Sequence, residues 1–245
     1  MCDNARSVTS EKCKLSLSAR YWYGAIAAFS RDRCGWGVTG LGRIAFASNQ
    51  PVVHLTPSEE HIVRKYQIVV VVGSLRRESF NRKLASAIAK LAPATFSFAQ
   101  LEIGNLPLYN QDDDANPAEA VKRMKADIKA ASGILFVTPE YNRSLPGVLK
   151  NALDHASRPY GQSVWARKPA GVIGVSVGPV GTALAQQHLR NILAYLDMPT
   201  LGQPEAFIHA KEGLFDDAGN IGEGSKPFLQ GWMDLYVDWV KKHCQ

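Results

Sequence analysis

The spacing of hydrophobic positions in this 245-residue chain alternates regularly between two patterns from residue 67 onward. Continuous apolar runs at 67–72, 133–137 and 170–176 have the length and composition of strands that are buried on both faces. The segment 95–103 alternates apolar and polar positions, which predicts a strand nearer an edge of the sheet. A short fifth strand is predicted around residues 199–201.

Segments with helical spacing separate these strands. Helices are predicted at about 79–90 and 146–156, and three more from apolar residues that recur on one helix face. The three faces are Val121, Met124, Ile128 and Ala131; then Leu184, His188, Ile192 and Leu196; and finally Phe228, Trp232, Leu235 and Trp239, in a helix at about 226–242. Five strands alternating with five helices predict an α/β fold, a doubly wound five-stranded parallel sheet with helices on both faces.

The charge of the chain is distributed unevenly. Residues 1–66 contain nine Lys and Arg against five Asp and Glu, whereas residues 67–245 contain nineteen against seventeen. The formal net charge of +6 therefore comes mainly from the first quarter, and the rest of the chain needs no acidic partner such as nucleic acid. No apolar run approaches the roughly 18–20 residues that cross a bilayer, so no membrane partner is expected.

The cysteines follow the same division. Cys2, Cys13 and Cys34 lie in the first quarter, Cys244 is the penultimate residue, and no CxxC pair occurs. This usage argues against a disulfide framework or a zinc site in the core. It suits a reducing compartment, so we expect a cytoplasmic protein without a metal site.

Residues 1–66 predict a poorly structured extension before a domain at 67–245, because they show no convincing run of elements. Four origins are open: a secretory signal cleaved near Ala25–Ala27, a transit peptide, a disordered appendage, or a native start further along, at Val63. The aromatic residues of the extension would also serve a nucleic-acid or membrane surface. However, they accompany neither a regular basic stripe nor amphipathic periodicity.

The segment GSLRRESFN, residues 73–81, follows the first buried strand, at the end where open α/β sheets bind ligands. A phosphate needs backbone N–H groups, hydroxyls and a cation at a helix N-terminus. Ser74 and Ser79 supply hydroxyls, Arg76 a forked donor and Asn81 an amide. Neither GxGxxG nor GxxxxGK[ST] is present, which argues against a Rossmann fingerprint and a P-loop. The alternative is an ordinary turn in which Ser79 only caps the helix.

The segment PEYNRSLPG, residues 139–147, follows the third strand of the chain. Pro139 and Pro146 stiffen the turn and expose the backbone N–H groups between them. A flavin ring needs such donors, because N–H groups near its N5 and O4 stabilise the reduced ring. The alternative is a proline-bounded turn before an amphipathic helix, with Lys150 and Asp154 as an i,i+4 surface pair.

Together, GSLRRESFN and PEYNRSLPGVLKNALD closely resemble the NADPH-dependent FMN reductase family, in its chromate and quinone reductase branch. The resemblance covers residues 67–245 and implies a flavodoxin-like fold with non-covalently bound FMN. It implies electron transfer from NADPH or NADH to a small-molecule acceptor: a quinone, a flavin, an azo compound or a metal oxyanion such as chromate. It also implies a homodimer or homotetramer. The implied FMN-contacting residues are Ser74, Arg76, Ser79, Phe80, Asn81, Pro139, Glu140, Tyr141, Asn142, Ser176 and Gly178.

Two positions depart from the family's pattern. Glu78 stands where a smaller residue is common, so we expect it to face solvent or to pair with Arg77. His155 stands where tryptophan is common, which puts aromatic packing there in doubt. The implied ping-pong chemistry is hydride transfer between the nicotinamide and the flavin, so no catalytic acid or base is nominated. A non-enzymatic, flavodoxin-like electron carrier is the alternative, although such carriers are usually strongly acidic.

Overall fold

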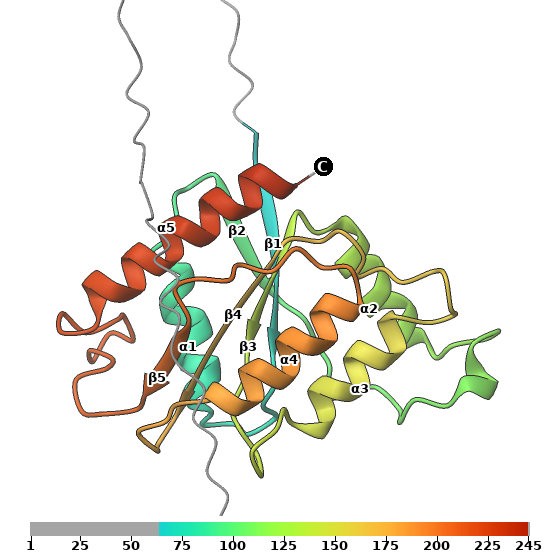
Figure 1. The fold of residues 1–245 in the computed structure, drawn as a ribbon, viewed down its shortest axis with the longest axis horizontal. Helices are drawn as coiled ribbons and strands as arrows, with labels where there is room; N and C mark the ends of the chain where they lie inside the picture. Colours follow the sequence, from blue (N-terminus) through green and yellow to red (C-terminus); the bar gives the residue numbers. More distant parts are fainter. Residues whose placement is uncertain (1–63, 245) are drawn as a thin grey trace, which may run out of the picture. The chain divides into compact units, whose positions relative to one another are not determined.

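The computed structural model describes residues 64–244, so the expected extension, residues 1–66, lies outside the described residues apart from its last three positions. Five parallel strands form one sheet in the order β2-β1-β3-β4-β5, which is the flavodoxin-like order (Figure 1). The strands are β1 (Tyr66–Val72), β2 (Phe96–Gln100), β3 (Gly133–Val137), β4 (Ala170–Ser176) and β5 (Ala206–His209). β2 lies at an edge, as its alternating pattern predicts.

Five helices cover both faces of this sheet. They are α1 (Phe80–Ala89), α2 (Glu119–Ala130), α3 (Gly147–Ala156), α4 (Ala183–Tyr195) and α5 (Lys226–His243), with a short 3-10 helix, η1, at Gln111–Asp113. α1 and α5 cover one face, and α2, α3 and α4 cover the other (Figure 1). Successive strand residues point to opposite faces, so Ile68 and Val70 join the core under α1 and α5, whereas Val69 and Val71 join the other core.

The prediction of a fifth strand at 199–201 was wrong. Thr200 forms only an isolated bridge with Ala170, and the edge strand β5 comes later, pairing with Ile173–Ser176 of β4. β5 has four residues, which is too few for a periodic pattern to distinguish it from a loop.

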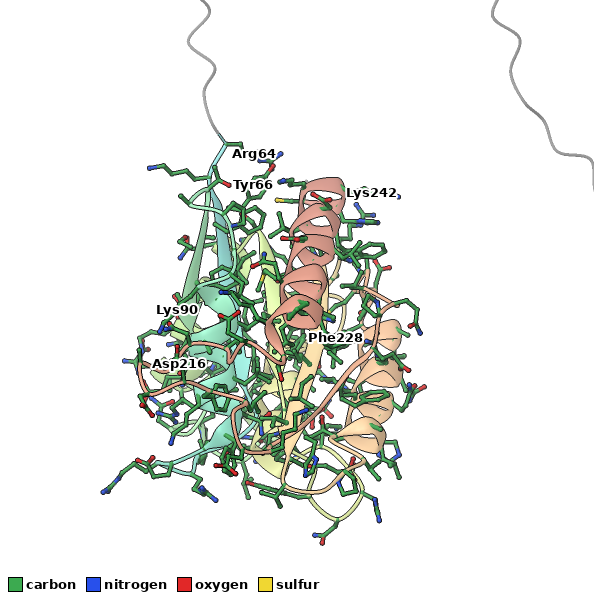
Figure 2. The ribbon with its side chains drawn as sticks, turned by 90° about the vertical axis from the view of Figure 1, so that its left-hand side faces the viewer. Arg64, Tyr66, Lys90, Asp216, Phe228 and Lys242 are labelled. Carbon is green, nitrogen blue, oxygen red and sulfur yellow. The ribbon has the colours of Figure 1, made fainter. Side chains whose placement is uncertain are left out.

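The predicted faces of α4 and α5 were also wrong in part. α4 buries Leu189 and Leu193, whereas the predicted Leu184 and His188 are exposed. In α5, the predicted Trp232 is buried, but Phe228 lies on the surface and is 46% exposed (Figure 2). The other buried residues of the two helices are Ala185, Gln186, Leu229, Met233, Tyr236, Val237 and Val240.

The space available against the sheet decides which face of α5 is buried. The ring of Tyr236 lies directly over Gly171 of β4, and a β-carbon at Gly171 would be 2.6 Å from the Tyr236 Cδ2 atom. Because Gly171 has no side chain, α5 can turn the face that carries Tyr236 toward the sheet. Helical spacing alone does not reveal this choice, because α5 has apolar residues around much of its circumference.

The two ends of the sheet have different roles. Arg64 and Tyr66, at the start of β1, lie at the same end of the molecule as Lys242, near the end of α5 (Figure 2). The loops after β1, β3 and β4 lie at the opposite, carboxyl end of the strands (Figure 1). Across residues 64–244, none of the helices is both long and apolar enough to span a membrane.

Candidate functional site

Three loops at the carboxyl ends of β1, β3 and β4 line a pocket of about 180 Å³, here called the loop pocket. It lies where the strand order reverses, which is where open α/β sheets bind ligands. The structure brings nine of the eleven predicted site residues into its wall; Asn142 and Gly178 are not among them. Its lining residues are Ser74, Arg76, Ser79, Phe80, Asn81, Pro139, Glu140, Tyr141, Val175, Ser176 and Val177.

The first loop, residues 73–81, leaves most of its backbone N–H donors without an acceptor among the described residues. Gly73 donates to the Val137 carbonyl at 2.9 Å, and a β-carbon at Gly73 would be 2.9 Å from the Thr138 Oγ1 atom. Within residues 64–244, the backbone N–H groups of Ser74–Glu78, and those of Phe80 and Asn81 at the start of α1, have no acceptor. Such a row of free donors before a helix is an anion-binding arrangement.

Two side chains shape this loop. The Ser79 Oγ atom accepts from the Arg82 backbone N–H at 3.4 Å, which confirms Ser79 as the N-cap of α1. Arg76 folds back so that its Nε donates to the Glu78 carbonyl at 3.0 Å, and its guanidinium carbon lies 5.8 Å from the Phe80 ring centroid. Because that carbonyl bond is exposed, Arg76 can exchange it for an anion at little cost.

Glu78 faces solvent, as predicted, but its ion-pair partner is Lys83 rather than Arg77, at 3.4 Å. Asn81 has a role that sequence reasoning missed. Its Nδ2 donates to the Val175 carbonyl at 2.8 Å, and its Oδ1 accepts from the Val175 N–H at 3.0 Å. The side chain is buried and both of its polar atoms bond to Val175, so the Asn81 amide links α1 to β4, and only the second N–H of its Nδ2 atom is left for a ligand.

The second loop, residues 139–147, contains a tight hairpin. Tyr141 and Ser144 exchange two backbone hydrogen bonds of 3.0 Å. Asn142 and Arg143 between them have φ angles of 50° and 65°, the left-handed pair that a type I′ turn requires. The side chain of Tyr141 is 50% exposed at the pocket, while the backbone is fixed by the turn.

Side chains also attach this hairpin to α4. The Glu140 Oε2 atom accepts from the backbone N–H groups of Leu184 and Ala185 at 3.0 and 3.2 Å. It therefore caps a helix whose own N-cap residue provides no side-chain acceptor. Ser144 Oγ lies 3.0 Å from the Nδ1 atom of His188. The Glu140 carboxylate thus serves α4, and the N–H groups of Glu140 and Asn142 have no acceptor among the described residues.

The third turn, after β4, is organised by Ser176. Its hydroxyl donates to the Gly181 carbonyl at 2.6 Å and accepts from the Gly178 N–H at 3.2 Å. Gly181 has a φ angle of 65°, and a β-carbon there would lie 2.8 Å from the Phe207 carbonyl carbon. The turn presents Val177, 72% exposed, at the pocket edge; sequence reasoning missed this residue because a lone valine in a loop carries no signal.

The helix after the second loop contributes support rather than chemistry. Lys150 Nζ lies 2.8 Å from Asp154 Oδ1, which confirms the predicted surface pair. His155 is buried, with its Nε2 atom 2.9 Å from the Pro107 carbonyl oxygen and its ring edge-on to Tyr109. His155 therefore packs α3 against the segment after β2.

A larger cavity, of about 520 Å³, lies at the other end of the sheet, between Arg167, Asp197 and Lys242. None of the three loops lines it, and the smaller loop pocket, where the three loops meet, is therefore the candidate site. Within the described part of the chain, no group of three or more His, Cys, Asp or Glu side chains is arranged for a metal ion.

The strand order and the pocket between the three loops define a flavodoxin-like protein with a candidate site at the β1–β3 switch point. The chain belongs to the NADPH-dependent FMN reductase family, which it matches over residues 66–213. The family resemblance of the two loop sequences is thereby confirmed.

Three known proteins are similar to this chain. The chain is 56% identical over 176 residues to a 2-hydroxy-1,4-benzoquinone reductase from a Burkholderia species, covering 71% of this chain and 96% of that protein. It is 50% identical over 177 residues to a quinone reductase of Pseudomonas putida, covering 72% and 95%. The solved structure of FerB, a flavoenzyme NAD(P)H:(acceptor) oxidoreductase from Paracoccus denitrificans, is 45% identical, with a TM-score of 0.71, covering 74% and 100%.

Proposed function

We propose that this oxidoreductase uses FMN to transfer electrons from NADPH or NADH to a quinone. The observation that carries the proposal is the row of unbonded backbone N–H groups at Ser74–Glu78, in a loop that also lines the loop pocket. The quinone reductases among its relatives support the choice of acceptor.

The residues of the loop pocket fit FMN. The free N–H groups of the first loop and Arg76 would bind the phosphate, and the free N–H groups of Glu140 and Asn142 would bind the ring edge. A volume of about 180 Å³ is below the roughly 300–1,000 Å³ of ordinary ligand pockets, which suits a cofactor that stays partly exposed to its reactants. FMN, when bound, supplies the hydride acceptor and donor chemistry.

The chain itself contributes orientation and electrostatics. The hairpin of residues 141–144 is rigid before any ligand arrives, so its N–H groups need little reorganisation to stabilise negative charge. The carboxylate of Glu140 is committed to the N-terminus of α4. We therefore nominate no catalytic acid or base, and we assign Glu140 as a positioning residue.

The exposed side chains at the pocket favour a flat organic acceptor. Tyr141 and Val177 are 50% and 72% exposed and offer apolar surface at the pocket. A ring can pack against such surface, whereas a hydrated oxyanion gains little from it. Quinones are accordingly the first substrates of the proposal; free flavin, azo compounds and chromate are secondary acceptors.

Steady-state kinetics test this function. If the nicotinamide and the acceptor occupy the same space in turn, double-reciprocal lines for NADPH against a benzoquinone are parallel. Intersecting lines would argue against a single shared site, and no oxidation of NADPH or NADH with any quinone would favour the electron-carrier alternative. The variant His155→Ala keeps its rate when FMN is bound, since His155 lies outside the loop pocket.

The remaining parts of the proposal rest on the sequence pattern and cysteine usage and, for the assembly, on the family resemblance. We propose that residues 67–245 form the functional domain, that the protein is cytoplasmic, and that it assembles as a homodimer or homotetramer. Light scattering of the FMN-loaded protein measures the assembly directly.

A further inference from the structure

A second pocket, of about 250 Å³, lies on the other side of the first loop. We call it the β2 pocket, because residues 100–104 at the end of β2 form one of its walls. Ser74 and Leu75 of the first loop and Arg82 of α1 form the rest of its rim. Ser74 also lines the loop pocket, so the first loop separates two neighbouring pockets.

Arg82 points to an anionic occupant. Its Nε atom is buried, and no hydrogen bond or ion pair within residues 64–244 engages its guanidinium. Arg76 and Lys83, which flank Arg82 in the same segment, do have partners, because Arg76 donates to the Glu78 carbonyl and Lys83 pairs with the Glu78 carboxylate. Arg82 is half-buried, and a buried Nε–H group without an acceptor is unfavourable, whereas a planar fork of N–H donors matches a phosphate or carboxylate.

The opposite wall of the β2 pocket suits a nucleoside. Glu102 lies just beyond β2, on the same pocket as Arg82. In dinucleotide-binding Rossmann folds, which share the doubly wound sheet, a carboxylate in this region accepts from the ribose of NAD, whereas an arginine there accommodates the 2′-phosphate of NADP. Leu75 and Leu101 supply apolar surface for a base. Gly104 makes room for Leu75, since a β-carbon there would lie 2.8 Å from the Leu75 Cδ2 atom.

We propose that the β2 pocket binds the 2′-phosphorylated adenosine ribose of NADPH. Arg82 binds the 2′-phosphate, and Glu102 accepts from the remaining ribose hydroxyl. The first loop then lies between two phosphates, that of FMN in the loop pocket and that of NADPH in the β2 pocket. The assignment rests on the proposed NAD(P)H-dependent function and makes NADPH the preferred donor over NADH.

The variant Arg82→Gln tests the assignment by kinetics. We expect the KM for NADPH to rise about 10- to 100-fold, as for the loss of hydrogen bonds to a charged group. The kcat at saturation, the KM for NADH and the FMN content stay within about twofold, because the loop pocket is unchanged. Lys83→Ala is the matched control: it removes one positive charge from the same helical turn, outside both pockets, and shifts neither KM by more than about twofold.

Calorimetry on the FMN-loaded wild-type protein gives a readout that is independent of turnover and of any variant's folding. We expect 2′-AMP to bind at least about tenfold more tightly than 5′-AMP or inorganic phosphate, and this preference to disappear in Arg82→Gln. Equal binding of 2′-AMP and 5′-AMP, or equal loss of NADPH and NADH use in the variant, would overturn the assignment.

The two proposals fail in different ways. A wild-type protein that binds 2′-AMP through Arg82 but reduces no quinone disproves the proposed function and leaves the pocket assignment standing. A wild-type protein that reduces quinones equally well with NADPH and NADH disproves the pocket assignment alone.

Discussion

The first and second loops line the same pocket, but they differ in how far hydrogen bonds within the protein already hold them. The backbone N–H groups of residues 74–78 have no acceptor within residues 64–244, whereas the hairpin at 141–144 is held by two backbone hydrogen bonds between Tyr141 and Ser144 and is attached to α4 by side-chain contacts. A phosphate carries enough charge to compensate many free donors, while a flavin ring offers few acceptors and needs a loop that is already rigid. The existing hydrogen bonds of each loop therefore indicate the charge of the ligand group it binds.

The largest effect is expected when the first loop loses its attachment to β4. Asn81→Ala removes both hydrogen bonds to Val175 and leaves a buried N–H and a buried carbonyl unpaired. At about 1–3 kcal/mol for each, the free energy of unfolding of the flavin-free protein should fall by about 2–5 kcal/mol in urea titrations. Ser86→Ala, an exposed change on the same helix, is the control. An unchanged midpoint in Asn81→Ala would show that the link is not structural.

The second loop should respond more weakly to the loss of its helix contact. Glu140→Ala removes the acceptor at the N-terminus of α4, which should lower the free energy of unfolding by about 1–2 kcal/mol. Glu140→Gln keeps an oxygen acceptor and should lose less. Both variants should weaken FMN through a more mobile hairpin, as measured by equilibrium titration. If Gln and Ala have equal effects, the carboxylate is not a cap.

A smaller fall in the free energy of unfolding is expected when the hairpin loses its other contact with α4, between Ser144 and His188. Ser144→Ala removes the contact with His188 but keeps the two backbone bonds to Tyr141. We expect a loss of about 0.5–1.5 kcal/mol in the free energy of unfolding, the usual value of one hydrogen bond. If Ser144→Ala lowers the free energy of unfolding more than Glu140→Ala does, Ser144 rather than Glu140 is the stronger contact between the hairpin and α4.

Removal of residues 1–62 should have no effect on either loop. The described chain begins at the amino end of the sheet, with Arg64 and Tyr66 far from the loops at the carboxyl ends (Figures 1 and 2). A chain that starts at Val63 is expected to keep its melting temperature, FMN affinity and activity, measured beside the full chain. Loss of soluble protein would refute this.

The predictable parts of the molecule are those whose signal is local. The buried strands, the N-cap Ser79 and both loop sequences are visible in short windows, because each depends on neighbouring residues. The links that make the loops a site are not local: Asn81 reaches Val175 across 94 positions, and Glu140 reaches Leu184 across 44. Such contacts depend on how helices pack on the sheet, which also decided the buried faces of α4 and α5.

The central claim is that the first loop binds the phosphate of FMN, and riboflavin, which lacks that phosphate, tests it most directly. Flavin-free protein should bind FMN at least about 100-fold more tightly than riboflavin in fluorescence titrations, as expected for two or more charge-assisted hydrogen bonds. Arg76→Ala should reduce this ratio about tenfold or more by weakening FMN alone. Equal affinities for FMN and riboflavin, or no binding of either, would contradict the account.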